Sequence, residues 1–169
     1  MSNLLNSGPF SRVRRNHALE HATLQILSGR QPALGLAGSS DIGGFWVLGE
    51  LDTQDLQEAV DEALVRLRHG ESALAIHPNC GTNFAAAGVM AGGAAWLGMI
   101  GSGGSIRRRL ERLPLIISLV TIVLVLAQPL GPILQAKVTT QAAPGNLKVT
   151  GITRFERGNM PVHRVTTAN

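Results

Sequence analysis

The chain has 169 residues, enough for one modest domain with attachments, and a formal net charge of +4. Only 15% of its residues are charged and 4% are aromatic, whereas 44% are hydrophobic. Aromatic stacking platforms are scarce, which argues against a nucleic-acid partner for the basic charge. That charge fits a membrane surface or a phosphate-bearing ligand. The low charged fraction indicates a membrane protein.

The first predicted helix begins near Pro9 and runs to about Ser28. It contains the sequence HALEH, an H-x-x-E-H motif. His17 and His21 lie one turn apart on such a helix, so their rings point the same way and can hold one metal ion. Glu20 lies beside them, where a carboxylate can take a proton from water. Because these polar residues interrupt an otherwise apolar stripe, burying them favours pairing or metal binding.

A small α+β domain is predicted for residues 1–83. An amphipathic helix capped by Asp52 or Thr53 ends near Gly70, and we expect it to pack with the H-x-x-E-H helix on a small sheet. Three short segments have the composition of strands. They cover residues 33–37, 45–51 and 72–76.

Residues 84–136 are predicted to form a two-helix transmembrane hairpin. Residues 84–101 and 113–135 contain no charged side chain. The second segment is long enough to span a bilayer at about 1.5 Å per residue. The first is marginal in length, so a buried soluble helix is its alternative, but its small residues suit close packing against another helix.

After residue 136 the chain is polar again. Residues 146–155 and 160–166 alternate in polarity around the pair Gly158-Asn159, which predicts a β-hairpin within residues 137–169. With a membrane hairpin before it, this β-hairpin emerges on the same side as residues 1–83 and can extend their sheet.

Two features of the sequence make opposite predictions about the side of the membrane on which the soluble part lies. The arginine-rich link between the apolar segments would face the cytoplasm by the positive-inside rule, which would put residues 1–83 outside. No apolar export signal is visible in residues 1–16, however. We therefore expect an integral membrane protein whose soluble part is cytoplasmic.

Cys80 is the leading candidate for a third metal ligand. It follows a predicted strand and opens a predicted helix, and a helix N-terminus favours the thiolate form of cysteine. A thiolate with two imidazoles is a known ligand set for catalytic zinc, with the fourth position open. His77 is an alternate third or fourth ligand, or a residue that supports the ligands. Asp41, in a glycine-flanked turn, is a third ligand candidate, a second acid/base group or a turn former.

Three motifs resemble, in the same order, those of the S-ribosylhomocysteine lyase family: HALEH, GGFWVLGELDTQDLQEAVDEALVRL and NCGT. That family belongs with the mitochondrial-processing-peptidase-like metallohydrolases, and the resemblance covers residues 16–84. It implies metal ligands at His17, His21 and Cys80 and an acid/base role for Glu20. The family's catalytic cysteine falls where this chain has Asp41, its long N-terminal region is absent here, and the membrane segment is an addition.

The metallopeptidase branch of this superfamily uses a downstream glutamate as its third ligand. Glu58 or Glu62 would fill that role, in place of Cys80. We expect a membrane-anchored hydrolase that uses Zn²⁺ or Fe²⁺ and acts on peptide. The alternatives are a lyase or isomerase acting on a small polar substrate, and a non-catalytic membrane protein with a structural metal site. The expected partners are the lipid bilayer, the substrate and, as a candidate, a second copy of the chain.

Overall fold

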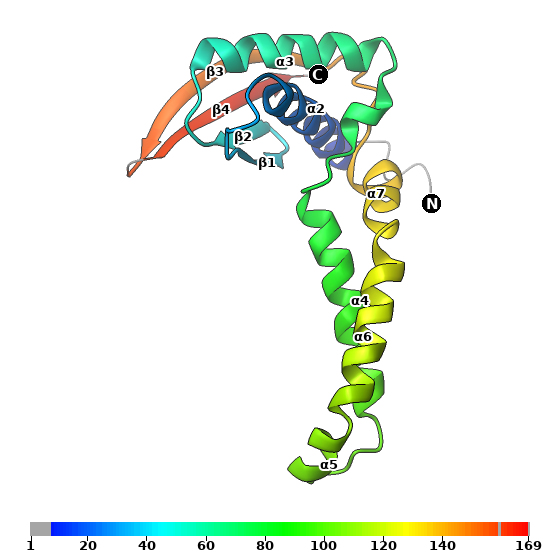
Figure 1. The fold of residues 1–169 in the computed structure, drawn as a ribbon. Coiled ribbons are helices and arrows are strands. Elements are labelled where there is room, and N and C mark those ends of the chain that lie inside the picture. The colour runs from blue at the N-terminus through cyan, green and yellow to red at the C-terminus, as the bar shows by residue number, and fades with distance from the viewer. Residues whose placement is uncertain (1–7, 159, 169) are drawn as a thin grey trace. The chain divides into compact units, whose positions relative to one another are not determined.

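The computed structural model describes residues 8–158 and 160–168, and its elements are labelled in Figure 1. The chain divides into two compact units. Unit 1 contains residues 1–77 and 135–169, and unit 2 contains residues 78–134. The expected α+β class is confirmed, because unit 1 combines helices with a four-stranded antiparallel sheet.

Helix α2, which carries the H-x-x-E-H motif, spans Gly8–Arg30 and packs on the sheet and on helix α3, Thr53–Arg68. The middle turns of α2 are almost wholly buried, and Leu19 and Leu27 are among its largest core side chains. The predicted cap of α3 is confirmed: the Asp52 carboxylate accepts a hydrogen bond of 2.7 Å from the Gln54 N–H.

The sheet has the strand order β1-β2-β4-β3, with every neighbouring pair antiparallel. Its strands are β1 (Ala37–Asp41), β2 (Gly44–Leu48), β3 (Lys148–Arg157) and β4 (Met160–Ala168). β3 and β4 form the predicted C-terminal hairpin, and β4 also pairs with β2 (Figure 1). In the register of β2 and β4, Phe45 lies opposite Val165. Gly158 follows β3 with φ 66°, whereas Asn159, the other residue of the predicted turn, lies outside the described residues.

The strand predicted at residues 33–37 is wrong. Strand β1 begins only at Ala37 and continues through the glycine- and serine-rich segment to Asp41. Its position follows from the tight turn that pairs Asp41 with Gly44 and sets the register with β2. As an exposed edge strand, β1 depends on this backbone pairing rather than on apolar side chains.

The strand predicted at residues 72–76 is also wrong. Ser72–Ala75 form the 3₁₀ helix η1 instead. Its sequence, Ser-Ala-Leu-Ala, contains no β-branched residue that would favour a strand. Carbonyl groups at the end of this short helix accept hydrogen bonds from side chains of α2, as described below.

Unit 2 consists of helices, of which α4 and α6 run side by side (Figure 1). Its helices are α4 (Gly81–Met99), α5 (Ile106–Glu111), α6 (Leu113–Ala127) and α7 (Leu130–Leu134). Gly98 lets the two long helices approach closely, because a Cβ atom there would meet the side chain of Ile116 at 2.8 Å. The second apolar segment is not one helix as predicted: it breaks after Ala127, at Gln128-Pro129.

Among the described helices, none is by itself both long and apolar enough to cross a membrane. Leu113–Ala127 and Leu130–Thr139 reach that length and composition only together, with a bend of 47° between them. The second part of this pair ends in the five-residue π-helix η2, Gln135–Thr139. The predicted transmembrane hairpin is therefore present as a helical hairpin, without a single clear membrane span.

Candidate metal centre

His17 and His21 are fixed on α2 by hydrogen bonds to two distant backbone carbonyls. Nδ1 of His17 lies 3.0 Å from the carbonyl oxygen of Thr139, and Nδ1 of His21 lies 2.8 Å from that of Ala75. A carbonyl oxygen can only accept, so each Nδ1 carries a proton, and Nε2 is the ring nitrogen that can bind a metal. Metal-ligating histidines typically have this arrangement, which sets both the tautomer and the ring orientation.

Gln25 continues the same face of α2 one turn beyond His21. Its Nε2 donates to the carbonyl oxygens of Leu74 and Ile76, each at 2.9 Å. The backbone on both sides of Ala75, the acceptor of His21, is therefore tied to α2 by a second side chain. Gln25 was missed in the sequence, although its place in the series 17, 21, 25 is a visible signal.

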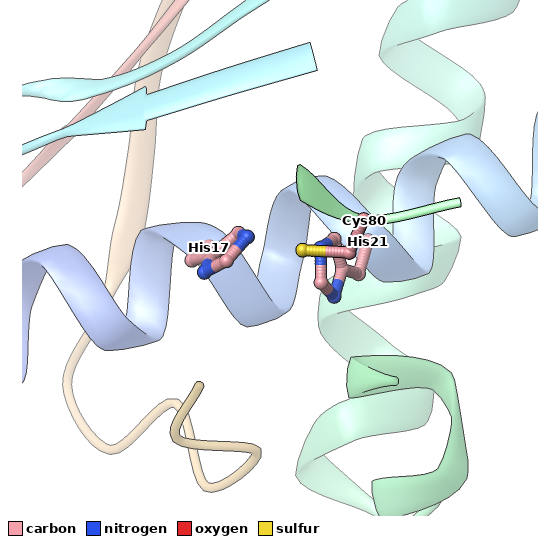
Figure 2. Close-up of side chains that lie close together, drawn as sticks. All are labelled: His17, His21 and Cys80. Carbon is pink, nitrogen blue, oxygen red and sulfur yellow. The ribbon is translucent and has the colours of Figure 1, made fainter. Parts of the chain in front are cut away.

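Cys80 provides the third donor. His17, His21 and Cys80 each offer a ligand atom, and these atoms all lie within 4.8 Å of one another; Figure 2 shows the three side chains. Ligand atoms of a tetrahedral zinc site are about 3.5 Å apart, so the donors fit one ion after small side-chain adjustments. Cys80 caps α4, and its Sγ lies 3.4 Å from the N–H of Thr82.

His77 connects Cys80 to unit 1 through the chain. Its ring centroid is 5.6 Å from that of His21, with the ring planes tilted by 40°. Cys80 follows three residues later, so the chain itself limits the distance between the two Cα atoms to about 11 Å. His77 is not part of the group of donors within 4.8 Å.

The backbone of His77 is held by a residue that the sequence did not single out. The side chain of Gln135 accepts a hydrogen bond of 2.8 Å from the His77 N–H and donates one of 3.1 Å to the His77 carbonyl oxygen. Gln135 is fully buried. No periodic pattern or motif marks it, because its partner lies 58 residues away in the chain.

Glu20 faces strand β1 rather than the carbonyls that hold the histidine rings. Its buried carboxylate accepts a hydrogen bond from the hydroxyl of Ser40. A Cβ atom at Gly38 would collide with the same carboxylate, so a larger residue there would displace the Glu20 side chain from this position. Glu20 is thus held in one orientation on the α2 turn that carries His17 and His21.

Asp41 is engaged in an ion pair at the end of β1. Its two carboxylate oxygens accept hydrogen bonds of 2.8 and 2.7 Å from Arg164, and one also accepts the N–H of Gly43 at 2.7 Å. The Arg164 hydrogen bonds hold the pKa of this carboxyl below its ordinary value of 3.8. Asp41 is not among the donors that gather with His17, and these contacts favour the turn-former role.

The two alternative third ligands, Glu58 and Glu62, form ion pairs with Arg30. The shortest N–O distances are 3.6 Å for Glu58 and 2.6 Å for Glu62. The Arg30 hydrogen bond lowers the pKa of the Glu62 carboxyl. Neither glutamate is among the donors that gather with His17 and His21.

Comparison with known proteins gives a family without an assigned function. A family model described as a domain of unknown function (DUF6391) matches residues 12–152. An uncharacterized protein of Picosynechococcus sp. (strain ATCC 27264 / PCC 7002 / PR-6) is 43% identical over 98 residues, covering 50% of this chain and 48% of the relative. The chain thus spans about half the length of that relative. No solved structure gave a significant match. The resemblance to S-ribosylhomocysteine lyases stays a prediction.

Proposed function

The chain belongs to the DUF6391 family, a domain of unknown function, and we propose from its own side chains that it is a membrane-anchored, metal-dependent hydrolase. In this proposal His17, His21 and Cys80 hold Zn²⁺ or Fe²⁺, and Glu20 is the general base. One observation carries it. Both histidine rings have Nδ1 fixed by a carbonyl oxygen, and their ligand atoms lie within 4.8 Å of a cysteine sulfur.

The donor set fits such an ion chemically. Two neutral imidazoles and one thiolate suit Zn²⁺ and Fe²⁺ better than Mg²⁺ or Ca²⁺, which prefer oxygen ligands. Bound Zn²⁺ or Fe²⁺ would act as a Lewis acid toward a water molecule or a substrate carbonyl oxygen. Glu20 would accept a proton from the attacking water and pass it to the leaving amine of a peptide. Ser40 would hold the Glu20 carboxylate in place for this transfer.

A second candidate function is a closed, structural metal site. The observation that favours it is the 5.6 Å separation between the ring centroids of His77 and His21. A rotation of the His77 side chain would offer a fourth protein ligand, and four protein ligands are typical of structural zinc. Such a site would stabilise the junction of α2 and η1 without any turnover.

The membrane anchor is proposed from the surface of unit 2. The α4 and α6 helices contain no charged residue, yet Val89, Trp96 and Leu126 are 76%, 68% and 65% exposed. Helices that are apolar on all sides need an apolar environment. The bent pair of Leu113–Ala127 and Leu130–Thr139 supports the proposal by length and composition.

Metal analysis of the purified full chain tests the proposed centre. We expect about one equivalent of zinc or iron per chain by elemental mass spectrometry, and loss of that metal in His21→Ala. The matched control is His69→Ala, because His69 is exposed at the end of α3 and its Nδ1 lies 2.9 Å from the carbonyl oxygen of Val65 in the same helix. Retention of metal by His21→Ala would overturn the proposed centre.

A further inference from the structure

The π-helix η2 contacts both segments that carry proposed ligands. At its start, the side chain of Gln135 pairs with the N–H and the carbonyl oxygen of His77, at 2.8 and 3.1 Å. At its end, the carbonyl oxygen of Thr139 lies 3.0 Å from Nδ1 of His17. Single π-helical turns occur frequently at functional sites.

The turn itself is closed by hydrogen bonds onto the Gln135 carbonyl. Thr140 donates to that oxygen from both its N–H and its hydroxyl, each at 2.9 Å. Thr140 is buried, and Gln135 is fully buried. The side chain of Gln135 and the carbonyl of Thr139 are therefore held in one rigid turn of backbone.

Gln135 also has a particular place in the chain. His77 is the last residue of unit 1 before residues 78–134, and Gln135 is the first residue after them. The Gln135 amide thus joins the two points at which the helical unit is inserted. The backbone from which the chain runs on to Cys80 is fixed at this junction.

We infer that Gln135 is a positioning residue that fixes the start of the His77–Cys80 loop relative to the histidines of α2. The side-chain amide of Gln135 binds both the N–H and the carbonyl oxygen of His77. A neighbouring strand in an antiparallel sheet binds the backbone of one residue in the same way. An apolar side chain of similar size could fill the same volume but could not fix the direction of this backbone. The inference rests on the proposed function for its chemical meaning, because the loop leads to the proposed thiolate ligand.

Cobalt substitution separates this role from a general contribution to folding. Co²⁺ is titrated into the metal-free full chain, and the thiolate-to-Co²⁺ charge-transfer band reports whether Cys80 is a ligand. For Gln135→Leu we expect Co²⁺ binding weakened by about 10- to 100-fold, with loss of this band. Gln135→Glu should lie in between, since its carboxylate still accepts the His77 N–H but cannot donate to the carbonyl oxygen.

The control is Gln31→Leu, which removes a glutamine bonded at 3.0 Å to Asp55 on the exposed surface. It should match the wild type in band and affinity. An unchanged band and affinity in Gln135→Leu would overturn the inference. Circular dichroism checks that each variant is folded, and Gln135→Glu, closest in shape, remains informative if the leucine variant does not fold.

Hydrogen exchange of the metal-free protein makes the outcome independent of the proposed function. We expect the His77 amide to exchange slowly in the wild type and at least ten-fold faster in Gln135→Leu. If the wild type gives no thiolate band, the proposed metal centre fails, while this difference in exchange still supports the positioning role. Equal exchange rates in the two proteins would overturn the inference whatever the metal result.

Discussion

His17 and Thr139 are 122 residues apart in the chain, yet Nδ1 of His17 lies 3.0 Å from the Thr139 carbonyl oxygen. The H-x-x-E-H motif is therefore only part of the candidate centre. A local helix sets the spacing of the two imidazoles, but the orientation of the His17 ring depends on backbone that follows the helical hairpin. Without that carbonyl the proton could sit on either ring nitrogen, and the lone pair would have no fixed direction.

Replacing Glu20 separates metal binding from turnover. Glu20→Gln keeps the size and shape of the side chain and an oxygen that can accept from Ser40, but removes the proton acceptor. We expect unchanged metal content and a rate of peptide hydrolysis lower by about 10²- to 10⁴-fold. Hydrolysis is measured on a library of quenched fluorescent peptides, with metal content determined on the same sample.

A matched control is Glu58→Gln on the exposed face of α3, which should retain both metal and activity. Full hydrolytic activity in Glu20→Gln would exclude Glu20 as the proton carrier. If the wild type itself is inactive on all peptides but holds metal, the hydrolase acting on peptides is excluded. A structural metal site, or a lyase or isomerase acting on a small polar substrate, is then favoured.

The motif helix could be predicted from the sequence because its signals are local. α2 and α3 lie close to their predicted limits, since caps, glycines and a spacing of about 3.6 residues act within a few turns of chain. Cys80 was proposed as a ligand from a local feature, a cysteine at a predicted helix start, together with the family resemblance. These features need no knowledge of the rest of the fold.

The carbonyls and amides around the site could not be predicted in this way. No motif in the sequence identifies Gln135, Thr139 or Ala75 as part of a site. They meet their hydrogen-bond partners only through tertiary packing. The predicted strand at residues 33–37 failed for a related reason. Strand β1 is defined by its register against β2, which composition alone does not reveal.

A charge in the middle of α6 tests the membrane anchor. Ile122 is 56% exposed, and at the centre of a membrane helix a lysine costs roughly 2.5–3.5 kcal/mol. We expect wild-type chain to stay with membranes during alkaline carbonate extraction, and Ile122→Lys to be partly released. Val65→Lys, on the exposed face of α3 in unit 1, should behave as the wild type. Release of the wild-type chain without detergent would contradict the anchor.

The Asp41–Arg164 ion pair should contribute stability that depends on pH. The pKa of Asp41 is lowered below 3.8 in the folded state, so its contribution is complete well above pH 3.8 and is lost as pH falls through the folded value. The Asp41 side chain is 48% exposed, so we expect Asp41→Asn to lower the free energy of unfolding at pH 7 by no more than about 1 kcal/mol. Urea unfolding at pH 7 and pH 3 measures the difference.

The same variant tests the catalytic role once predicted for Asp41. We expect Asp41→Asn to keep its metal and its hydrolytic activity, because Arg164 holds the carboxylate in an ion pair. Asp61→Asn, on the exposed face of α3, is the stability control. Loss of turnover with retained metal would restore Asp41 as an acid/base group.

His163 should make unit 1 less stable in mild acid. It is fully buried on β4, with Nε2 3.0 Å from the Thr53 hydroxyl oxygen, and its Nδ1 has no hydrogen-bond partner among the described residues. Burial lowers the pKa of His163 below 6.5, and the charge of Arg154 lowers it further, against an opposite effect of Asp52.

Below pH 6.5 the unfolded chain therefore binds a proton at His163 that the folded chain does not, and the free energy of unfolding falls. The loss approaches about 1.4 kcal/mol per pH unit and ends at the lowered folded pKa. His163→Gln should abolish this part of the slope, whereas His69→Gln, at an exposed site, should keep it. Urea unfolding between pH 7.5 and pH 5 measures the slopes in a Trp96→Phe background, which leaves Trp46 as the fluorescent reporter of unit 1. An unchanged slope in His163→Gln would assign the acid sensitivity to the other histidines.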